Sequence, residues 1–587
     1  MTIFNVFTLC GGLALFLFGM STMGDGLERK AGSRLKDLLE RLTSNPFKGF
    51  LLGLAVTAVI QSSSATTVMV VGFVNAGVMQ LNQAIGIIMG ANVGTTVTSW
   101  ILSLTGIQGE SFWIQMLKPA NFSPVLALVG ILLYMFCKSN SKKDIGSILL
   151  GFAVLMTGME MMSGAVAPLK TMPEFANLLL LFSNPLLGVL AGALLTAVIQ
   201  SSSASVGILQ ALASTGAVTY GSAIPIILGQ NIGTCVTAML SSVGTNKNAR
   251  RASLVHLYFN VIGTTVFLIG YGIVSVVFRP AFISQSIDAF GIAIVHTAFN
   301  VVSTAVMLPF SSLLEKLAYA TIRDDAAEEP QPAFEVSLLD TRLLATPSVA
   351  VEQARLVANM MAEFSFDACR KAMTLLDNYD PSVYDEVAEL ENRVDVLEDK
   401  MGTYLLALGR ESLSSDDTSQ VALLLHSIGD LERIGDHALG LARTAGEIHS
   451  KEIVFSTQAQ KDIMTLRMAV TDIISITVRA FTRQDRAAAR HVEPLEQVVD
   501  MLRYRMKEGH IDRMQTGVCS QQTGFVYSDL ITGCQRISDH CSNLAVSLIR
   551  TEVDKLDAHE YLNNIKSGGD REYTELFSTY KKKYGIE

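Results

Sequence analysis

The stretch NPFKGFLLGLAVTAVIQSSSATT, from Asn45 to Thr67, occurs twice in this sequence. It returns with changes as NPLLGVLAGALLTAVIQSSSASV, from Asn184 to Val206, at an offset of 139 residues. The same offset relates GANVGTT at Gly90 to GQNIGTC at Gly229. An offset that stays constant over so long a stretch indicates an internal duplication. Each copy is an apolar run interrupted by Gln-Ser-Ser-Ser, and matching interruptions in two halves of a chain point to the binding site of a transporter.

Composition divides the 587-residue chain into two unlike parts. Residues 1–320 are apolar and carry 16 Lys and Arg against 10 Asp and Glu, whereas residues 321–587 carry 29 against 44. We therefore expect more than one domain, with the second part soluble-like. Its acidic balance argues against nucleic acid as a partner. Seven scattered cysteines form no CxxC motif, so nothing predicts a disulfide framework.

Seven apolar segments of the first part are long enough to cross a bilayer, which takes about 20 residues in a helix. They are residues 4–23, 83–104, 122–137, 145–167, 221–243, 252–277 and 288–310. The Gln-Ser-Ser-Ser segments, residues 49–80 and 187–217, have apolar arms too short to span singly, so we expect each to form a re-entrant hairpin. The polar turn of such a hairpin needs protein or water around it. Within residues 83–104 we expect a break at 92–95.

The distribution of Lys and Arg predicts the orientation of these segments, because basic loops stay on the cytoplasmic side. Basic residues gather at 29–48, 138–143 and 247–251, which gives seven crossings and a cytoplasmic C-terminal part. Each repeat then contributes an odd number of crossings, so the repeats are inverted and the two hairpins can meet near the midplane, as suits alternating access. The N-terminal run lacks a basic n-region and a cleavage site, so we expect it to remain as a span in the cell (inner) membrane.

The predicted fold class is all-α: a polytopic membrane protein with inverted repeats and two re-entrant hairpins, followed by a soluble helical-bundle domain. We expect a transmembrane domain at residues 1–320, made of repeat one at about 1–137, repeat two at about 145–245 and extra spans at 252–310. A linker at 321–349, a duplicated helical bundle at 350–555 and a charged tail at 556–587 are expected to follow.

Both repeat cores lack charged side chains, since residues 49–105 and 184–245 contain no Asp, Glu, Lys or Arg. Binding there must use neutral groups, and a hydroxyl can donate to an anion or offer a lone pair to a cation. The half-helix after each Gln-Ser-Ser-Ser begins with N–H groups that suit an oxyanion, while carbonyls of the hairpins and the broken span suit sodium. A co-bound cation would lower the cost of moving an anion through this core. The uncharged repeat cores therefore favour cation-coupled anion transport, although neutral solutes are also compatible with them. The simpler alternative is that the hydroxyls only join close-packed helices.

The candidate residues for substrate and sodium binding are the polar side chains of the two repeats: Gln61, Ser62, Ser63, Ser64, Thr66, Asn92, Thr95, Thr96, Gln200, Ser201, Ser202, Ser203, Ser205, Asn231 and Thr234. The paired Gln-Ser-Ser-Ser repeats with their GANVGTT and GQNIGTC strings resemble the type II sodium–phosphate cotransporter family over residues 1 to about 310. The resemblance implies sodium-driven uptake of inorganic phosphate, with the two repeats forming the substrate and sodium sites. In the second copy Cys235 stands where the first has Thr96, so a role of Thr96 need not have a counterpart.

Two histidines of the last spans, His256 and His296, begin the similar strings HLYFN and HTAFN. Such residues either hydrogen-bond neighbouring helices or sense protons, and the sequence leaves both readings open. No catalytic constellation and no GxxxxGK[ST] motif is present, so we expect no enzyme and favour coupling to an ion gradient over ATP hydrolysis.

The second part of the chain repeats as well, since ENRVDVLEDK at Glu391 resembles EQVVDMLRYR at Glu496 and ERIGDHA at Glu432 resembles QRISDHC at Gln535. Carboxylates that converge from neighbouring helices are how bundles build metal sites, although a solvated acidic face is the alternative. The candidate metal ligands are Glu391, Asp395, Asp430, Glu432, Asp436, Glu496, Asp500 and Asp539. The string DLERIGDHA resembles the PhoU-like domain, which implies a duplicated three-helix bundle, a tie to phosphate regulation, and binding of a divalent or iron-type metal.

We therefore predict a sodium-coupled transporter of inorganic phosphate with a cytosolic regulatory domain. Its predicted partners are phosphate, sodium and membrane lipid. The alternative is a sensor that binds phosphate and signals through the bundle without substantial flux. Sodium stoichiometry, net direction and the oligomeric state, a homo-oligomer included, stay open.

Overall fold

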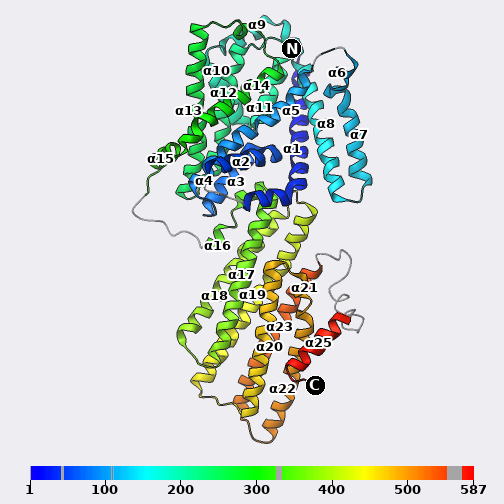
Figure 1. The fold of residues 1–587 in the computed structure, drawn as a ribbon, viewed down its shortest axis with the longest axis vertical. Helices are drawn as coiled ribbons and strands as arrows, with labels where there is room; N and C mark the ends of the chain where they lie inside the picture. Colours follow the sequence, from blue (N-terminus) through cyan, green and yellow to red (C-terminus); the bar gives the residue numbers. More distant parts are fainter. Residues whose placement is uncertain are drawn as a thin grey trace. The chain divides into compact units, whose positions relative to one another are not determined.

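The computed structural model describes residues 2–40, 45–107, 109, 111–324, 334–550 and 571–586. These residues are mostly helical, and the β-structure among them is an isolated antiparallel bridge between Thr219 and Ser286. The chain divides into two compact units (Figure 1), one of residues 1–350 with 412–415 and one of the remaining residues from 351 onward. The predicted all-α class, with an apolar helical unit followed by a helical bundle, is confirmed.

Seven helices or helix pairs in the described part of the chain are long and apolar enough to cross a membrane, and they coincide with the seven predicted spans. Their helices are α1 (Ile3–Glu40), α4 (Leu81–Gly94) with α5 (Thr96–Ser103), α7 (Pro119–Phe136), α8 (Asn140–Val166), α12 (Tyr220–Ser241), α13 (Lys247–Val277), and α14 (Ala289–Met307) with α15 (Ser311–Thr321). Shorter elements, α6 (Phe112–Met116) and α9 (Pro173–Leu181), lie in the connections. The predicted break falls at Thr95, between α4 and α5, whereas α12 is continuous.

The two Gln-Ser-Ser-Ser segments form the predicted hairpins, whose arms are too short to span singly. They consist of α2 (Pro46–Ile60) with α3 (Ser63–Asn75), and of α10 (Pro185–Ile199) with α11 (Ser202–Ala213). Both begin alike: Asn45 and Asn184 cap the first arm, each through its side-chain oxygen, and a proline follows at the first helical position. This combination fixes where a helix starts.

Glycines let each hairpin approach its own span, so that α2 packs on α4 and α10 packs on α12. A Cβ added at Gly90 would overlap the backbone oxygen of Phe50, and one added at Gly229 would overlap that of Val189. Backbones in such contact leave room for glycine alone. The same glycine contact in both repeats, 139 residues apart, shows that the duplication extends to the packing.

The two repeats also pack on each other in a crossed manner. The second arm of hairpin one, α3, contacts the span of repeat two, α12, while α11 contacts α5 of repeat one. Outside these contacts the unit exposes apolar faces, such as Leu190, Leu194 and Val198 on α10. Faces of this kind suit a lipid environment.

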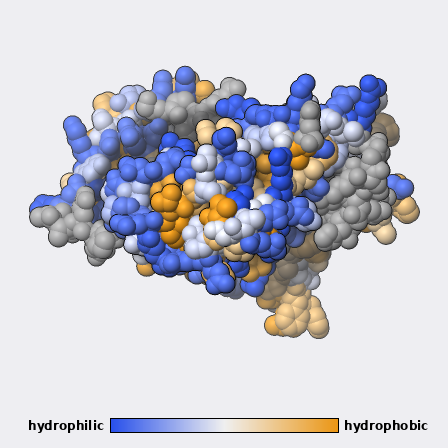
Figure 2. Space-filling view, turned by 90° about the horizontal axis from the view of Figure 1, so that it is seen from below, coloured by the Kyte–Doolittle hydropathy of each residue, from blue (hydrophilic) through white to orange (hydrophobic). Residues whose placement is uncertain are grey.

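The second unit is a duplicated helical bundle. Its first bundle contains α17 (Pro347–Leu375), α18 (Pro381–Leu408) and α19 (Ser415–Ser450), and its second contains α20 (Thr457–Arg483), α21 (Arg486–Ala489), α22 (Val492–Gln515) and α23 (Gln521–Arg550). Arg467 of α20 holds Asp377, which follows α17, in a two-pronged ion pair at 2.5 and 2.7 Å. Hydrophilic side chains dominate the face of the molecule seen in Figure 2.

Two stretches that the sequence assigned to a linker and a tail contain short helices. In the predicted linker, α16 (Phe334–Ser337) and a 3-10 turn at Thr341–Ala345 belong to the first unit, where the turn packs on α3. In the predicted tail, α25 (Arg571–Lys583) packs on α22.

Candidate functional site

Each Gln-Ser-Ser-Ser sequence lies at the turn of a hairpin, where one half-helix ends and the next begins. Gln61 and Gln200 follow α2 and α10 in the left-handed backbone region, with φ of 59° and 58°. For a residue other than glycine this conformation costs on the order of 1–2 kcal/mol. Both repeats hold the same strained turn, which reverses the chain so that α3 and α11 begin directly after it.

The serine after each glutamine caps the next half-helix. Ser62 Oγ accepts a hydrogen bond from Ala65 N at 3.1 Å, and Ser201 Oγ accepts one from Ala204 N at 3.2 Å. A cap satisfies one of the N–H groups that a first helical turn leaves unpaired, and the others keep their positive partial charge. Each hairpin turn therefore combines hydroxyls with helix N-terminal N–H groups, a donor set that suits an oxyanion.

A buried pair of hydroxyls joins the two arms of each hairpin. Thr57 Oγ1 donates to Thr66 Oγ1 at 3.0 Å, and Thr196 Oγ1 donates to Ser205 Oγ at 2.8 Å. All four side chains are fully buried. Thr57 and Thr196 were not among the predicted site residues, although the 139-residue offset relates them and could have revealed them.

The polar side chains on the spans make equivalent contacts in the two repeats. Asn92 Nδ2 donates to Ile88 O at 3.0 Å, and Asn231 Nδ2 donates to Ile227 O at 2.8 Å. Further hydroxyl donations run from Thr95 to Ala91 O, from Thr96 to Val93 O and from Thr234 to Gln230 O. Because these donors are satisfied by carbonyls of their own span, the side-chain oxygens are what remains for a cation, except that Asn92 Oδ1 also lies 3.4 Å from His256 Nε2.

The predicted residues thus gather at the two hairpin turns and on the spans against which the hairpins pack. Most are buried, among them Ser63, Ser202 and Ser203, while Gln200 is exposed. That the two turns meet near the midplane, and that these residues bind phosphate and sodium, stay predictions.

The two intramembrane histidines bond to neighbouring helices. His256 Nε2 lies 3.4 Å from Asn92 Oδ1, and His296 Nδ1 lies 2.8 Å from Ser99 Oγ. Both histidines are buried. These contacts are the interhelical bonds that the sequence predicted, proton sensing stays a prediction, and His256 reaches one of the predicted site residues.

Of the candidate metal ligands, the set in the second bundle has the most convergent oxygens. Within the described residues, Glu496, Asp500 and Asp539 offer ligand atoms that all lie within 4.8 Å of one another. Burial, and then the charge of Asp500, raise the pKa of Asp539. Gln535, at the position of Glu432 in the first copy, donates to both oxygens of Asp539 at 2.9 and 3.0 Å. Carboxylates crowded in this way fit a bound cation.

In the first bundle, four of the five predicted carboxylates lie close enough for the charge of one to affect the pKa of another. The pKa of Glu391 is raised by burial and then by Asp436 and Asp395, and the pKa of Glu432 is raised by burial and then by Asp436. The fifth, Asp430, lies elsewhere. Its Oδ1 is 2.8 Å from His540 Nδ1 and accepts from Asn543 Nδ2 at 3.0 Å. These contacts engage Asp430 apart from the other four carboxylates, and its role as a metal ligand stays a prediction.

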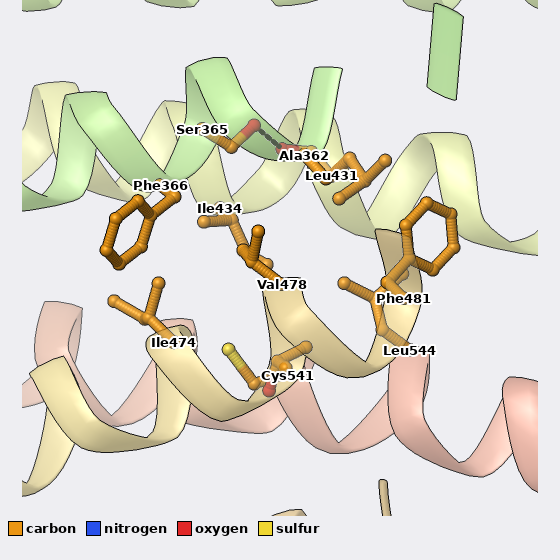
Figure 3. A pocket seen from close by; sticks show the side chains of 11 residues that line it. Ala362, Ser365, Phe366, Leu431, Ile434, Ile474, Val478, Phe481, Cys541 and Leu544 are labelled. Atoms are coloured by element: carbon orange, nitrogen blue, oxygen red, sulfur yellow. Dashed lines mark hydrogen bonds between the residues drawn. The ribbon is translucent and has the colours of Figure 1, made fainter. Parts of the chain in front are cut away.

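A small pocket in the second unit is apolar (Figure 3). Side chains of α17, α19, α20 and α23 line it, among them Phe366, Ile434, Ile474 and Cys541. The Ser365 hydroxyl there donates to Leu431 O at 2.8 Å. A pocket with this lining offers an oxyanion no charge partner.

Inverted repeats with polar hairpin turns inside a set of apolar spans define a membrane transporter of the secondary type. The chain belongs to the Na+/Pi-cotransporter family, whose model matches residues 15–164 and 171–307, and it also carries a PhoU domain, matched at residues 359–445 and 463–548.

Relatives of this chain agree with that assignment. A protein of Escherichia coli K12 named "Putative inorganic phosphate export protein YjbB" is 26% identical over 565 residues, which cover 94% of this chain and 99% of the relative. The "Uncharacterized protein YqeW" of Bacillus subtilis is 30% identical over 53% of this chain and 96% of its own. The "Sodium-dependent phosphate transport protein 2A" of Rattus norvegicus is 35% identical over 98 residues, 16% of this chain and 15% of that protein.

Proposed function

We propose that this protein moves inorganic phosphate across the cell (inner) membrane by alternating access, coupled to sodium, and that its second unit is a cytoplasmic regulatory domain. The observation that carries the proposal is the pair of serine-capped half-helices, at Ser62 and Ser201, in repeats without a charged side chain. Their N–H groups and hydroxyls would hold the phosphate oxygens. Hydroxyl and carbonyl oxygens of the same turns would hold sodium, whose charge lowers the cost of carrying the anion.

Sodium coupling draws support from the name of the rat relative and from the uncharged site, while the full-length E. coli relative is named for export. A symporter runs in whichever direction the combined gradients favour, so uptake and export are both compatible with one mechanism. The net direction then depends on the gradients and on the second unit.

The test is labelled phosphate flux in proteoliposomes that contain the full chain, with an inward, an outward and no sodium gradient. Ser62→Ala and Ser201→Ala should each lower sodium-driven flux at least about tenfold, since each removes a donor and a helix cap at the site. Ser275→Ala, on α13, serves as the matched control because that hydroxyl bonds only within its own helix in the described contacts.

Flux without sodium dependence would overturn the coupling. Absence of flux in folded wild-type protein, together with phosphate binding, would favour the alternative, a phosphate sensor that signals through the second unit.

We also propose that the second unit binds a divalent or iron-type metal ion through the two carboxylate sets. Glu496, Asp500 and Asp539 would supply the ligands in the second bundle, and Glu391, Asp395, Glu432 and Asp436 those in the first. The bound ion would neutralise the crowded carboxylates and tie neighbouring helices together.

A further inference from the structure

The two repeats hold one equivalent pair of residues in two different states. In repeat one, Thr98 Oγ1 donates to Gln61 Oε1 at 2.9 Å, and both side chains are buried. The counterparts in repeat two, 139 residues further on, are Thr237 and Gln200. Thr237 Oγ1 is buried without a hydrogen-bond partner among the residues that the structure describes, and Gln200 is exposed.

The spans of the two repeats also differ. In repeat one the helix is interrupted at Thr95, between α4 and α5, although Thr95 keeps helical φ and ψ of −60° and −27°. In repeat two α12 runs unbroken from Tyr220 to Ser241. The backbone of the turn is the same in both, with Gln61 and Gln200 at nearly equal φ. The difference therefore lies in how each hairpin meets its span.

In transporters built from inverted repeats, alternating access moves one repeat against the other around a fixed site. We propose that Thr98 and Thr237 are positioning residues that bond their glutamines alternately: Gln61–Thr98 closes one repeat in the conformation described here, and Gln200–Thr237 closes the other in the opposite conformation. The proposal rests on the proposed alternating access. The orphaned hydroxyl of Thr237 supports it, because a buried unpaired hydroxyl is unfavourable and gains its partner in the second state.

The experiment uses Thr98→Val and Thr237→Val, which keep the side-chain shape and remove the hydroxyl. The readout is the rate at which a cysteine introduced by Ser201→Cys reacts with a water-soluble thiol reagent, in full-length protein. Cys10, Cys137 and Cys519, which are not buried, are first replaced by serine. The readout needs no flux, so it stands even if sodium-driven transport fails.

Thr98→Val weakens the present conformation and should slow labelling at position 201, by up to the factor of about five that one buried hydrogen bond contributes to the equilibrium. Thr237→Val weakens the opposite conformation and should speed labelling or leave it at its maximum. Thr98→Ser, which restores the hydroxyl, should return the rate to that of wild type. Shifts in the same direction for both valine variants, or none for Thr98→Val, would overturn the proposal.

A second, independent observation concerns the strap, residues 334–346, which precedes the helical bundle and lies on the first unit. Its carboxylate Asp340 is almost fully buried, accepts from Asn75 Nδ2 of α3 at 2.7 Å and pairs with Arg342 at 2.9 Å. Arg342 Nε donates to Ser241 O, at the end of α12, at 2.6 Å. Leu343 is fully buried.

These contacts join the two repeats through one short segment. α3 is an arm of the hairpin of repeat one, and Ser241 ends the span of repeat two. Ser337 Oγ adds a hydrogen bond to Ala76 O at 3.0 Å, directly after α3. A buried carboxylate held by both an arginine and an amide resists removal, because breaking the set leaves an unpaired charge. A segment fixed in this way opposes any motion of the hairpin of repeat one against α12.

We infer that the strap is a latch, which holds the transport unit in the conformation described here. Arg342→Gln should then raise sodium-driven phosphate flux about three- to tenfold, the factor expected for the loss of a charge-assisted hydrogen bond that stabilises one state. Arg323→Gln removes an exposed arginine outside the strap and is the matched control.

A reversible lock makes the test sharper. A Cβ at position 72 would lie 3.5 Å from Arg342 Cβ, within the range of a disulfide. In the Gly72→Cys, Arg342→Cys double variant, oxidation should abolish flux and reduction should restore it to at least the wild-type level. Each single variant, oxidised alike, controls for the native cysteines.

The outcomes separate the latch from the proposed transport. Wild-type protein without sodium-driven flux would contradict the proposed function. Flux that is unaffected by the disulfide would overturn the latch alone, as would a fall in flux for Arg342→Gln in folded protein. Hydrogen exchange of the peptides that contain Ser62 and Ser201 offers a readout without transport, and equal exchange in oxidised and reduced protein would also overturn the latch.

Discussion

His540 of α23 holds Asp430 of α19, with 2.8 Å between Nδ1 and Oδ1, and so joins the two copies of the helical bundle. Asn543, one turn further along α23, donates to the same oxygen at 3.0 Å. His540 also stacks on His437 of α19, with ring centroids 5.5 Å apart. A polar cluster therefore bridges the copies at Asp430, which the sequence predicts as a metal ligand.

Removing the carboxylate of Asp430 should destabilise the second unit without affecting metal. Asp430→Asn loses a charge-assisted bond in a partly buried site, which we expect to cost about 1–3 kcal/mol and to lower the unfolding temperature by about 2–12 °C. Calorimetry of the full chain measures the shift, and elemental analysis measures bound metal. Asp399→Asn, at an exposed position of α18, is the control. A loss of metal with unchanged stability would contradict this assignment.

Helical geometry explains why Asp430 contacts a different set of residues from Glu432 and Asp436. Glu432 and Asp436 are four residues apart and share a face, whereas Asp430 precedes Glu432 by two residues, about 200° around the helix. The hairpins could be predicted because the repeat marks their positions twice, whereas the break occurs in the span of repeat one and not in α12. The unequal hydrogen bonding of Thr98 and Thr237 could not be predicted, because two matching sequences do not specify which copy forms the bond.

The carboxylate set of the second bundle should respond to a divalent cation. Binding to the folded state alone stabilises it, by about 2.7 kcal/mol when the cation is at a hundredfold its dissociation constant. We expect Mn²⁺ to raise the unfolding temperature of the full chain and Asp500→Asn to reduce that rise. Gln535→Glu should increase it, because the variant supplies the carboxylate that the first copy has at Glu432. An unchanged response in both variants would rule out this set as the site.

The histidine stack should make the second unit acid-sensitive. Burial, and then His540, lower the pKa of His437 below its usual 6.5. When the pKa of a histidine is lower in the folded state than in the unfolded state, folding favours the neutral form. The contribution of His437 to the stability of the folded state is therefore complete above about pH 6.5 and is lost as the pH falls below that value. Unfolding temperatures between pH 7.5 and 5 should therefore fall less in His437→Gln than in wild type. The raised pKa of Glu391 acts in the opposite direction, since its contribution is lost as the pH rises.

A steeper acid loss in His437→Gln would contradict that account. Glu391→Gln provides the comparison. It removes a group that favours the folded state at low pH, so the unfolding temperature should fall more between neutral and low pH than it does in wild type.

The glycine contacts between hairpin and span should be equally intolerant of a methyl group in both repeats. Gly90→Ala and Gly229→Ala each place a Cβ on a backbone oxygen, that of Phe50 or of Val189. A backbone cannot rotate away as a side chain can. We therefore expect each variant to lose at least about 1–3 kcal/mol of stability, the cost typical of overpacking. Gly270→Ala on α13 is the matched control, because nothing lies within 4 Å of the added atom.

The measurement is the fraction of protein that stays monodisperse in detergent after heating. If both contacts set the hairpin against its span as described, Gly90→Ala and Gly229→Ala lose monodispersity at lower temperature while Gly270→Ala matches wild type. Full tolerance at Gly229 with loss at Gly90 would mean that hairpin two is free to move away from α12, and that only repeat one depends on the close approach.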